Sequence, residues 1–267
     1  YGTISVDGGR VESIWLWNRS GGVIEARPGD DGRENVVSPK VLENDGVLRV
    51  LSGTVEAVGN SASTASRVGD DGVSSGEFSG VGGSLLLEDR WEMDGSTLLG
   101  DGVVLAGTLN GQVTVPSEAT FTNRGTLYAD VSGEGTLAVG TPGGSSRYVA
   151  VQGDLTVAEV DWNAGKLTSS SDNSLLIGSA TRMVVAGEVE VAYGSQLTVS
   201  NYGTIVVEGL LGYSYNSAGT TVFHNYGTIS VDGGRVESIW LWNRSGGVIE
   251  ARPGDDGREN VVSPKVL

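Results

Sequence analysis

The feature that most constrains this chain is an internal repeat without a mismatch. Residues 1–42 return letter for letter as residues 226–267. Repeats that share only a fold diverge until little beyond the buried pattern matches, whereas full identity indicates a recent or homogenised tandem duplication. We therefore expect 1–225 to be one full repeat and 226–267 to begin the next, in a window on a longer tandem array. The alternative is a single duplicated end.

Composition favours an all-β chain with many tight turns. Gly supplies 43 of the 267 residues and Pro only 6, which fits short turns better than a disordered Pro-rich chain. A unit that spans 1–225 is also long enough to bury a core of its own.

Charge and cysteine content narrow the classes of partner. The net charge is −16, which argues against nucleic acid or an anionic membrane surface as a partner. The chain has no Cys, so neither a disulfide nor a thiolate metal site is possible in it. No stretch approaches the roughly 18 uninterrupted apolar residues of a membrane-spanning helix. We expect no nucleic-acid partner and no membrane-embedded segment.

Apolar and polar residues alternate along most of the chain, as in short half-buried strands. Ile4 and Val6 point one way and their neighbours the other, and the same holds for Val189 with Val191 and for Leu197 with Val199. Gly, Asn, Asp and Ser separate these runs, and no amphipathic helix is evident. The pattern predicts an all-β fold.

A turn motif of the form Asn-x-Gly-Thr-Leu/Ile recurs between these runs. Its three full occurrences contain Asn123 and Gly125, Asn201 and Gly203, and Asn225 and Gly227. We expect the Asn side chain to bond nearby backbone, Gly to take a positive φ, Thr to face water and the aliphatic residue to enter the core. Each motif should therefore mark the start of a strand.

The spacing of the Asn residues predicts a parallel β-solenoid. Asn201 is followed by Asn225, and Asn18 by Asn44, so both intervals lie in the low to mid twenties. Such a period is typical of one solenoid coil, which gives about ten coils in each repeat. Two irregular stretches, 26–35 and the Ser/Gly-rich 60–83, are expected to be loop excursions.

The Asn-x-Gly-Thr-Ile turns resemble those of the right-handed parallel β-helices found in bacterial surface proteins, namely autotransporter passengers and filamentous-haemagglutinin-type adhesins. The resemblance covers most of the repeat but rests on a short motif. It implies a right-handed helix and a secreted, elongated, non-catalytic protein at the cell surface.

The sequence Gly-Asp-Asp-Gly occurs in both excursions and again at 254–257. Hard cations prefer carboxylate and carbonyl oxygens, so Asp30, Asp31, Asp70 and Asp71 are calcium candidates. The competing interpretation is that Asp and Gly are common turn residues in an acidic chain. We expect no other cofactor.

Two identical tryptophan pairs are candidate contact residues. Trp15 and Trp17 flank Leu16 and share one side of an expected strand, and Trp240 and Trp242 repeat this arrangement. An exposed pair could stack on a sugar or on a neighbouring fibre, and a packed pair would be purely structural. The tyrosines of two turn motifs, Tyr202 and Tyr226, could stack across coils.

Catalytic constellations are sparse. His224 is the only histidine, it directly precedes a turn, and no nucleophile elbow accompanies it. A β-helix can also be a polysaccharide lyase or hydrolase, which would need converging carboxylates, and Asp154, Glu159 and Asp161 lie close in sequence. Identical tandem copies serve reach and avidity more than turnover, so we expect no enzyme.

These observations together favour a structural repeat of an extracellular bacterial filament or giant fibrous adhesin. Its partners would be neighbouring copies of the same repeat, stacked end to end without a cap. The alternative is an adhesin stalk that binds carbohydrate or a lateral fibre.

Overall fold

The structure is a computed structural model in which β-strands are stacked in parallel and no helix is present in the described part of the chain. It describes residues 2–11, 15–27, 35–37, 41–58, 73–80, 82–88, 90–94, 97–141, 149–167, 174–191, 197–212, 221–237, 239–252 and 260–263. The chain forms two compact units, Tyr1–Thr126 and Leu127–Leu267.

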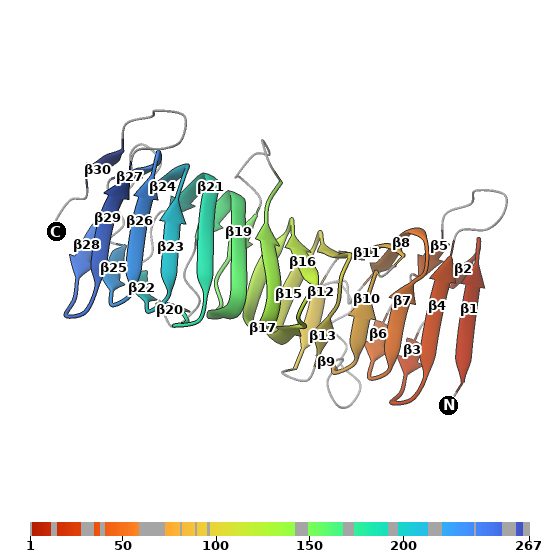
Figure 1. The fold of residues 1–267 in the computed structure, drawn as a ribbon. Coiled ribbons are helices and arrows are strands. Elements are labelled where there is room, and N and C mark those ends of the chain that lie inside the picture. The colour runs from red at the N-terminus through yellow and green to blue at the C-terminus, as the bar shows by residue number, and fades with distance from the viewer. Residues whose placement is uncertain are drawn as a thin grey trace. The chain divides into compact units, whose positions relative to one another are not determined.

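In the first unit the strands form three rows, each made of parallel partners from successive coils (Figure 1). The first row is β1 (Thr3–Asp7), β4 (Val23–Arg27), β7 (Val47–Val50), β10 (Glu77–Ser79) and β13 (Leu98–Leu99). The second is β2 (Arg10–Val11), β5 (Asn35–Val37), β8 (Gly53–Val58), β11 (Gly83–Glu88), β14 (Val103–Leu105) and β16 (Thr120–Asn123). The third is made of two separate sets: β3 (Trp15–Asn18) and β6 (Val41–Asn44) pair in a two-stranded sheet of their own, and β9 (Val73–Ser74), β12 (Arg90–Met93) and β15 (Thr108–Val115) pair in the main sheet.

The second unit repeats this plan. It begins with β17 (Thr126–Val139), β18 (Ala150–Val151) and β19 (Leu155–Leu167). One row is then β20 (Ser174–Ile177), β22 (Thr198–Asn201), β25 (Val222–Asn225) and β28 (Trp240–Asn243). The next is β21 (Arg182–Val191), β23 (Thr204–Val207), β26 (Thr228–Asp232) and β29 (Val248–Arg252), and the last adds β24 (Leu210–Gly212), β27 (Arg235–Glu237) and β30 (Val261–Ser263).

Alternating side chains create the core of each unit. Inward aliphatic residues such as Leu48, Val185 and Val207 are fully buried, and their neighbours along each strand are more exposed. Burial of one large apolar side chain stabilises a fold by roughly 1.5 to 3 kcal/mol, and parallel pairing brings like positions of successive coils together. The predicted all-β parallel solenoid is confirmed.

The number of coils differs from the prediction. The structure has about eight turns, against about ten expected in each repeat. Coil length is not constant: Val47 pairs with Glu77, whereas Leu98 pairs with Thr114, so the first of these coils takes nearly twice as much chain as the second. Dividing the chain length by one motif spacing therefore gives an incorrect number of coils, because the coils differ in length.

The expected excursion at 60–83 is partly wrong. Within it, β9 and β10 are paired strands, and Phe78 of β10 lies in the core, where its ring meets that of Trp91 edge-on at a centroid distance of 5.4 Å. These strands are only two and three residues long, so they carry too little alternation to stand out from the Ser/Gly-rich sequence around them.

Candidate functional site

The predicted turn motif forms the corner between two rows of strands. The side-chain oxygen of Asn123 accepts a hydrogen bond from the backbone N–H of Gly125 at 3.0 Å, and Asn201 accepts one from Gly203 at 3.1 Å. The residue after the motif Thr is buried at each full occurrence, and a strand begins at that Thr. The predicted bond of Asn to nearby backbone is therefore seen at Asn123 and Asn201, and the predicted strand starts are seen at all three motifs.

The motif asparagines also bond to one another across coils. In the second unit the amide of Asn201 donates to Asn225 Oδ1 at 2.8 Å, and Asn225 donates to Asn243 Oδ1 at 2.8 Å. In the first unit Asn18 donates to Asn44 Oδ1 at 2.7 Å. We call these chains of amides the Asn ladders. Because their inner members are buried, each rung satisfies polar groups that water cannot reach.

The role predicted for the motif glycines is wrong. Gly125, Gly203 and Gly227 are not among the glycines with positive φ. They are required for space: a Cβ on Gly227 would lie 2.1 Å from the carbonyl oxygen of Gly203, and one on Gly125 would lie 2.0 Å from that of Gly107. The backbone of the preceding coil therefore passes where any side chain would begin.

The duplicated segment occurs in two environments within this chain. In the first copy, Ile4 of β1 is 45% exposed, whereas its equivalent Ile229 of β26 is fully buried because β23 covers it. At the other side the relation is reversed: Ala26 of β4 is buried under β7, whereas the equivalent Ala251 of β29 is exposed. The side of the segment that is exposed in one copy is therefore buried in the other.

The two copies nevertheless have the same internal geometry. β1 and β26 have equivalent bounds, as do β4 and β29, and Thr3 pairs with Val23 just as Thr228 pairs with Val248. The register between the first two strands of this row is therefore the same in both copies, although the exposure of the strands differs.

An exposed cluster of aromatic rings lies on the outer surface of the second unit. We call Tyr202, Tyr226, His224, Trp242 and Arg244 the aromatic row. Tyr202 and Tyr226 stack with a centroid distance of 4.8 Å and an interplanar angle of 5°, which confirms the predicted pair. The ring of His224 lies 6.4 Å from those of both Tyr226 and Trp242. The two tyrosines and Trp242 are all exposed large side chains.

Arg244 contacts two other members of the aromatic row, Trp242 and His224. Its guanidinium lies over the Trp242 ring at 4.8 Å from the centroid, and its Nε donates to His224 Nδ1 at 2.8 Å. This bond assigns the neutral tautomer that carries its proton on Nε2. Burial, and secondly the charge of Arg244, lower the pKa of His224 below its ordinary value of 6.5. The imidazole is therefore held neutral as an acceptor.

The tryptophan pairs lie on strands, as expected, and Trp17 and Trp242 point outward. Trp17 is 55% exposed with Arg19 at 5.5 Å from its ring centroid, which matches the Trp242 and Arg244 pair of the second copy. Trp240 is half-buried, and Trp15 begins β3, although its side chain lies outside the described residues. The outward members are thus available for contact, while Trp91 and Trp162 are core residues.

Ion pairs on the outer surface join residues of successive coils. Arg19 bonds Asp45 at 3.1 Å, Arg182 bonds Glu159 at 3.0 Å, and Lys166 bonds Glu190 at 3.2 Å. Such exposed pairs each contribute about 0 to 1 kcal/mol.

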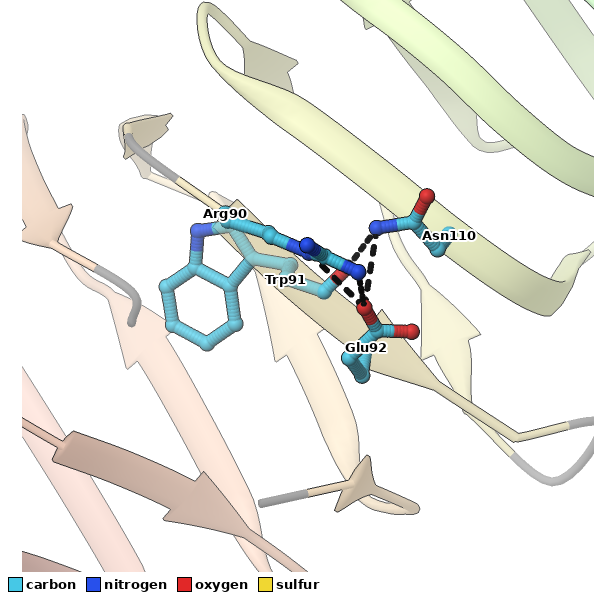
Figure 2. A network of polar contacts seen from close by, with 4 residues as sticks. All are labelled: Arg90, Trp91, Glu92 and Asn110. Atoms are coloured by element: carbon cyan, nitrogen blue, oxygen red, sulfur yellow. Dashed lines mark hydrogen bonds and ion pairs between the residues drawn. The ribbon is translucent and has the colours of Figure 1, made fainter. Parts of the chain in front are cut away.

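A polar network joins β12 to β15 (Figure 2). Glu92 accepts from Arg90 Nε at 2.9 Å and from Asn110 Nδ2 at 3.0 Å. The ring of Trp91 points into the core, and its Nε1 donates to the Glu88 carbonyl at 2.8 Å. The network therefore holds β12 against β15 through one carboxylate oxygen of Glu92, Oε1.

The carboxylates considered for catalysis are only partly brought together. Burial, then Glu159, raise the pKa of Asp161, while Arg182 acts in the opposite sense. Burial is also the main cause that raises the pKa of Asp154, whose Oδ1 accepts from the Leu176 N–H at 2.8 Å. Glu159 bonds Arg182 instead of a second acid. Asp154 and Glu159 are thus engaged in bonds along the coils.

The calcium candidates Asp30, Asp31, Asp70 and Asp71 lie outside the described residues. Among the residues that the structure does describe, no group of three or more His, Asp or Glu side chains is placed to hold a metal ion. Nothing helical in the described ranges has the length and apolarity needed to cross a bilayer.

Apart from the predicted tyrosine pair, the aromatic row and the Asn ladders could not be found from the motif alone, because both join residues from different coils. Tyr202 and Tyr226 fall at the same place of two motifs, which was the available signal, whereas the interval from His224 to Trp242 matches no period of the motif. Comparison with known protein families, with curated proteins and with solved structures finds no match to this chain.

Proposed function

We propose that this chain is a structural repeat of an elongated bacterial surface protein, in which successive copies of residues 1–225 stack end to end into one solenoid. The observation that carries the proposal is that the second copy of the duplicated segment pairs in register with the coil before it, through β26, β27 and β28. Residues 1–42 have the same sequence as that copy, residues 226–267, so they can pair with a preceding coil in the same way.

The second copy supports the proposed joint from one side. Strands β23, β24 and β25 of the preceding coil cover β26, β27 and β28, and pair with them in register from Thr204 with Thr228 to Asn225 with Asn243. This pairing buries Ile229 and extends the Asn ladder. The two sets of strands are in direct contact, as they would be between coils of one continuous solenoid.

The first copy supports the same joint from the other side. There, Asn18 donates to Asn44 and to the Val47 carbonyl of the next coil. Its equivalent Asn243 donates instead to the carbonyl of Gly247 within its own turn. A segment covered on both sides would combine the two sets of contacts, and a chain of many units would repeat that joint.

The expected extracellular location and non-enzymatic role belong to this proposal. They are supported by the resemblance of the Asn-x-Gly-Thr-Ile turns to those of bacterial surface β-helices, and by the parallel solenoid itself. The net charge of −16 would keep neighbouring fibres soluble and apart.

The test is a series of chains extended by one and by two further copies of residues 1–225, imaged by negative stain. Each added unit should lengthen a thin particle of constant width by roughly 40 to 50 Å, since eight to ten coils lie about 4.8 Å apart. Compact beads joined by linkers would refute the proposal.

A second candidate function is carbohydrate binding by the aromatic row. It is favoured by the exposure of Trp242, Tyr202 and Tyr226 and by Arg244, which could bond a hydroxyl or carboxylate of a sugar that stacks on these rings. The test is binding to a glycan array by the intact chain and by Trp242→Ala. Tyr128→Ala, which removes another exposed ring of the same unit, is the control. Equal binding by all three would exclude the row as the site.

A further inference from the structure

We infer that the aromatic row binds one uncharged polysaccharide chain in extended form, laid across successive coils along the direction in which they stack. The inference rests on the second candidate function, carbohydrate binding, and names the class of its ligand. All five residues of the row belong to the described part of the second unit. The ligand would contact the outer surface of the solenoid and no strand edge.

The residues of the row form two columns that cross three coils. Tyr202, Tyr226 and Arg244 directly follow β22, β25 and β28, so they occupy the same corner of successive coils. His224 pairs with Trp242 on the outer face of β25 and β28, beside that corner. Successive coils lie about 4.8 Å apart, so a ligand that contacts the whole row extends over roughly 10 Å. A single sugar ring is too short for this, whereas a short run of linked sugars fits.

The exposure of the row does not come from an uncovered coil. The strands that precede Tyr202 and Tyr226, β22 and β25, have paired neighbours on both sides, yet the two rings are 45% and 39% exposed. Trp17, the equivalent of Trp242, is 55% exposed although β6 pairs with its strand β3. These side chains therefore point sideways from the stack and stay accessible when a further coil follows.

The strands that carry the row contain no acidic residue. Neither Asp nor Glu occurs in β20, β22, β25 or β28, in a chain with 33 acidic and 17 basic residues. The neighbouring row of strands does hold acids, at Glu188, Asp232 and Glu250. The net charge of −16 repels a polyanion, and a second copy of this chain, at a distance. An uncharged polymer meets no such repulsion.

The row supplies the two kinds of contact that a sugar uses. Its exposed rings offer apolar surface to the C–H groups of a sugar. The tyrosine hydroxyls and the guanidinium of Arg244 can donate to sugar oxygens, and so can Nε2–H of His224, because its Nδ1 accepts from Arg244. Tyr202 stacks on Tyr226, and Arg244 lies over Trp242. Because these contacts already order the side chains, binding costs little further ordering.

The first test varies the length of the ligand. Dimers and hexamers of β-1,4-linked glucose, mannose, xylose and N-acetylglucosamine are titrated into the intact chain in a calorimeter. At least one hexamer should bind about tenfold or more tightly than its own dimer. The hexamer of α-1,4-linked glucose, which coils, should bind less tightly than extended hexamers. The hexamer of β-1,4-linked mannuronic acid should bind less tightly than its uncharged mannose counterpart.

The second test locates the site with matched variants. Trp242→Ala and Tyr226→Ala should each weaken binding of the best hexamer by about tenfold or more. Trp17→Ala removes the equivalent ring of the first copy, where Arg19 bonds the carboxylate of Asp45, and should bind as the intact chain does. Tyr128→Ala, which removes an exposed ring elsewhere in the second unit, should do the same. Circular dichroism verifies that each variant is folded.

Each contrary result has a definite meaning. Equal binding of dimer and hexamer would overturn the inference and leave the second candidate function in place, because the row would then bind one terminal sugar. Tighter binding of the mannuronic acid hexamer would also overturn it, and so would the failure of every uncharged hexamer to bind. If the row variants instead lower the average mass in sedimentation, the row is an interface between copies and the inference falls. End-to-end stacking is tested separately by the extended chains.

Discussion

Ile4 and Ile229 occupy the same position of two identical segments, yet Ile4 is 45% exposed and Ile229 is fully buried. Truncation of a buried Ile to Ala destabilises by about 2 to 5 kcal/mol. Ile229→Ala should therefore lower the free energy of unfolding by that amount, while Ile4→Ala should change it by less than about 1 kcal/mol. Denaturant unfolding followed by circular dichroism measures both, and equal losses would contradict the covered joint.

Gly2 and Gly227 form a second matched pair. A Cβ on Gly227 would lie 2.1 Å from the Gly203 carbonyl oxygen, whereas one on Gly2 would meet nothing within 4 Å. Gly227→Ala should force the coils apart and cost about 1 to 3 kcal/mol, as overpacking does, and Gly2→Ala should be nearly neutral. Thermal unfolding compares them. A harmless Gly227→Ala would show that the coils separate more easily than their contacts imply.

Asn225 lies in the middle of an Asn ladder. Asn225→Ala removes the acceptor of Asn201 and the donor to Asn243, and it leaves the buried amide of Asn201 with the Thr228 carbonyl, at 3.2 Å. We expect a loss of about 1 to 3 kcal/mol and faster hydrogen exchange in β26. Asn243→Ala, at the exposed end of the ladder, should cost less, and the reverse order would contradict the ladder.

His224 should make the second unit less stable in mild acid. Its pKa is lowered in the folded state, mainly by burial and secondly by Arg244, so the unfolded state binds the proton more readily. The contribution of the neutral ring is fully present above about pH 6.5 and is lost as pH falls through the folded pKa. His224→Gln should remove this pH dependence, and Arg244→Gln should move the pKa of His224 upward.

Nuclear magnetic resonance can follow this titration without assignment because the chain has one histidine. A pKa at or above the ordinary value in the intact chain would be inconsistent with the bond that Arg244 Nε donates to His224 Nδ1. It would also contradict the role of Arg244 in joining His224 to Trp242 within the aromatic row.

The features predicted from the sequence are those that one coil determines by itself. Alternation around residues such as Ile205 and Val207 places the strands and their buried faces, and the Asn-x-Gly-Thr pattern places the corners. The stacked pair Tyr202 and Tyr226 was also predictable, because the two motifs are one coil apart and equivalent positions of successive coils lie together.

The features that were missed depend on the alignment of one coil with the next. Gly227 looks like an ordinary turn glycine until the carbonyl of Gly203 is known to pass beside it. In the same way, Arg244 directly follows β28 but donates its Nε proton to His224 of β25, on the neighbouring coil, and lies over the ring of Trp242. Coils of unequal length prevent such pairs from being deduced by counting residues.

The matching strand registers of the two copies have a consequence for how such a protein can change over generations. Recombination between identical copies inserts or deletes whole units equal in length to residues 1–225. Each junction between two neighbouring copies that remains after such an event keeps the sequence that it had before. If the repeats stack as proposed, the length of the solenoid would therefore change in one genetic step without any compensating substitution.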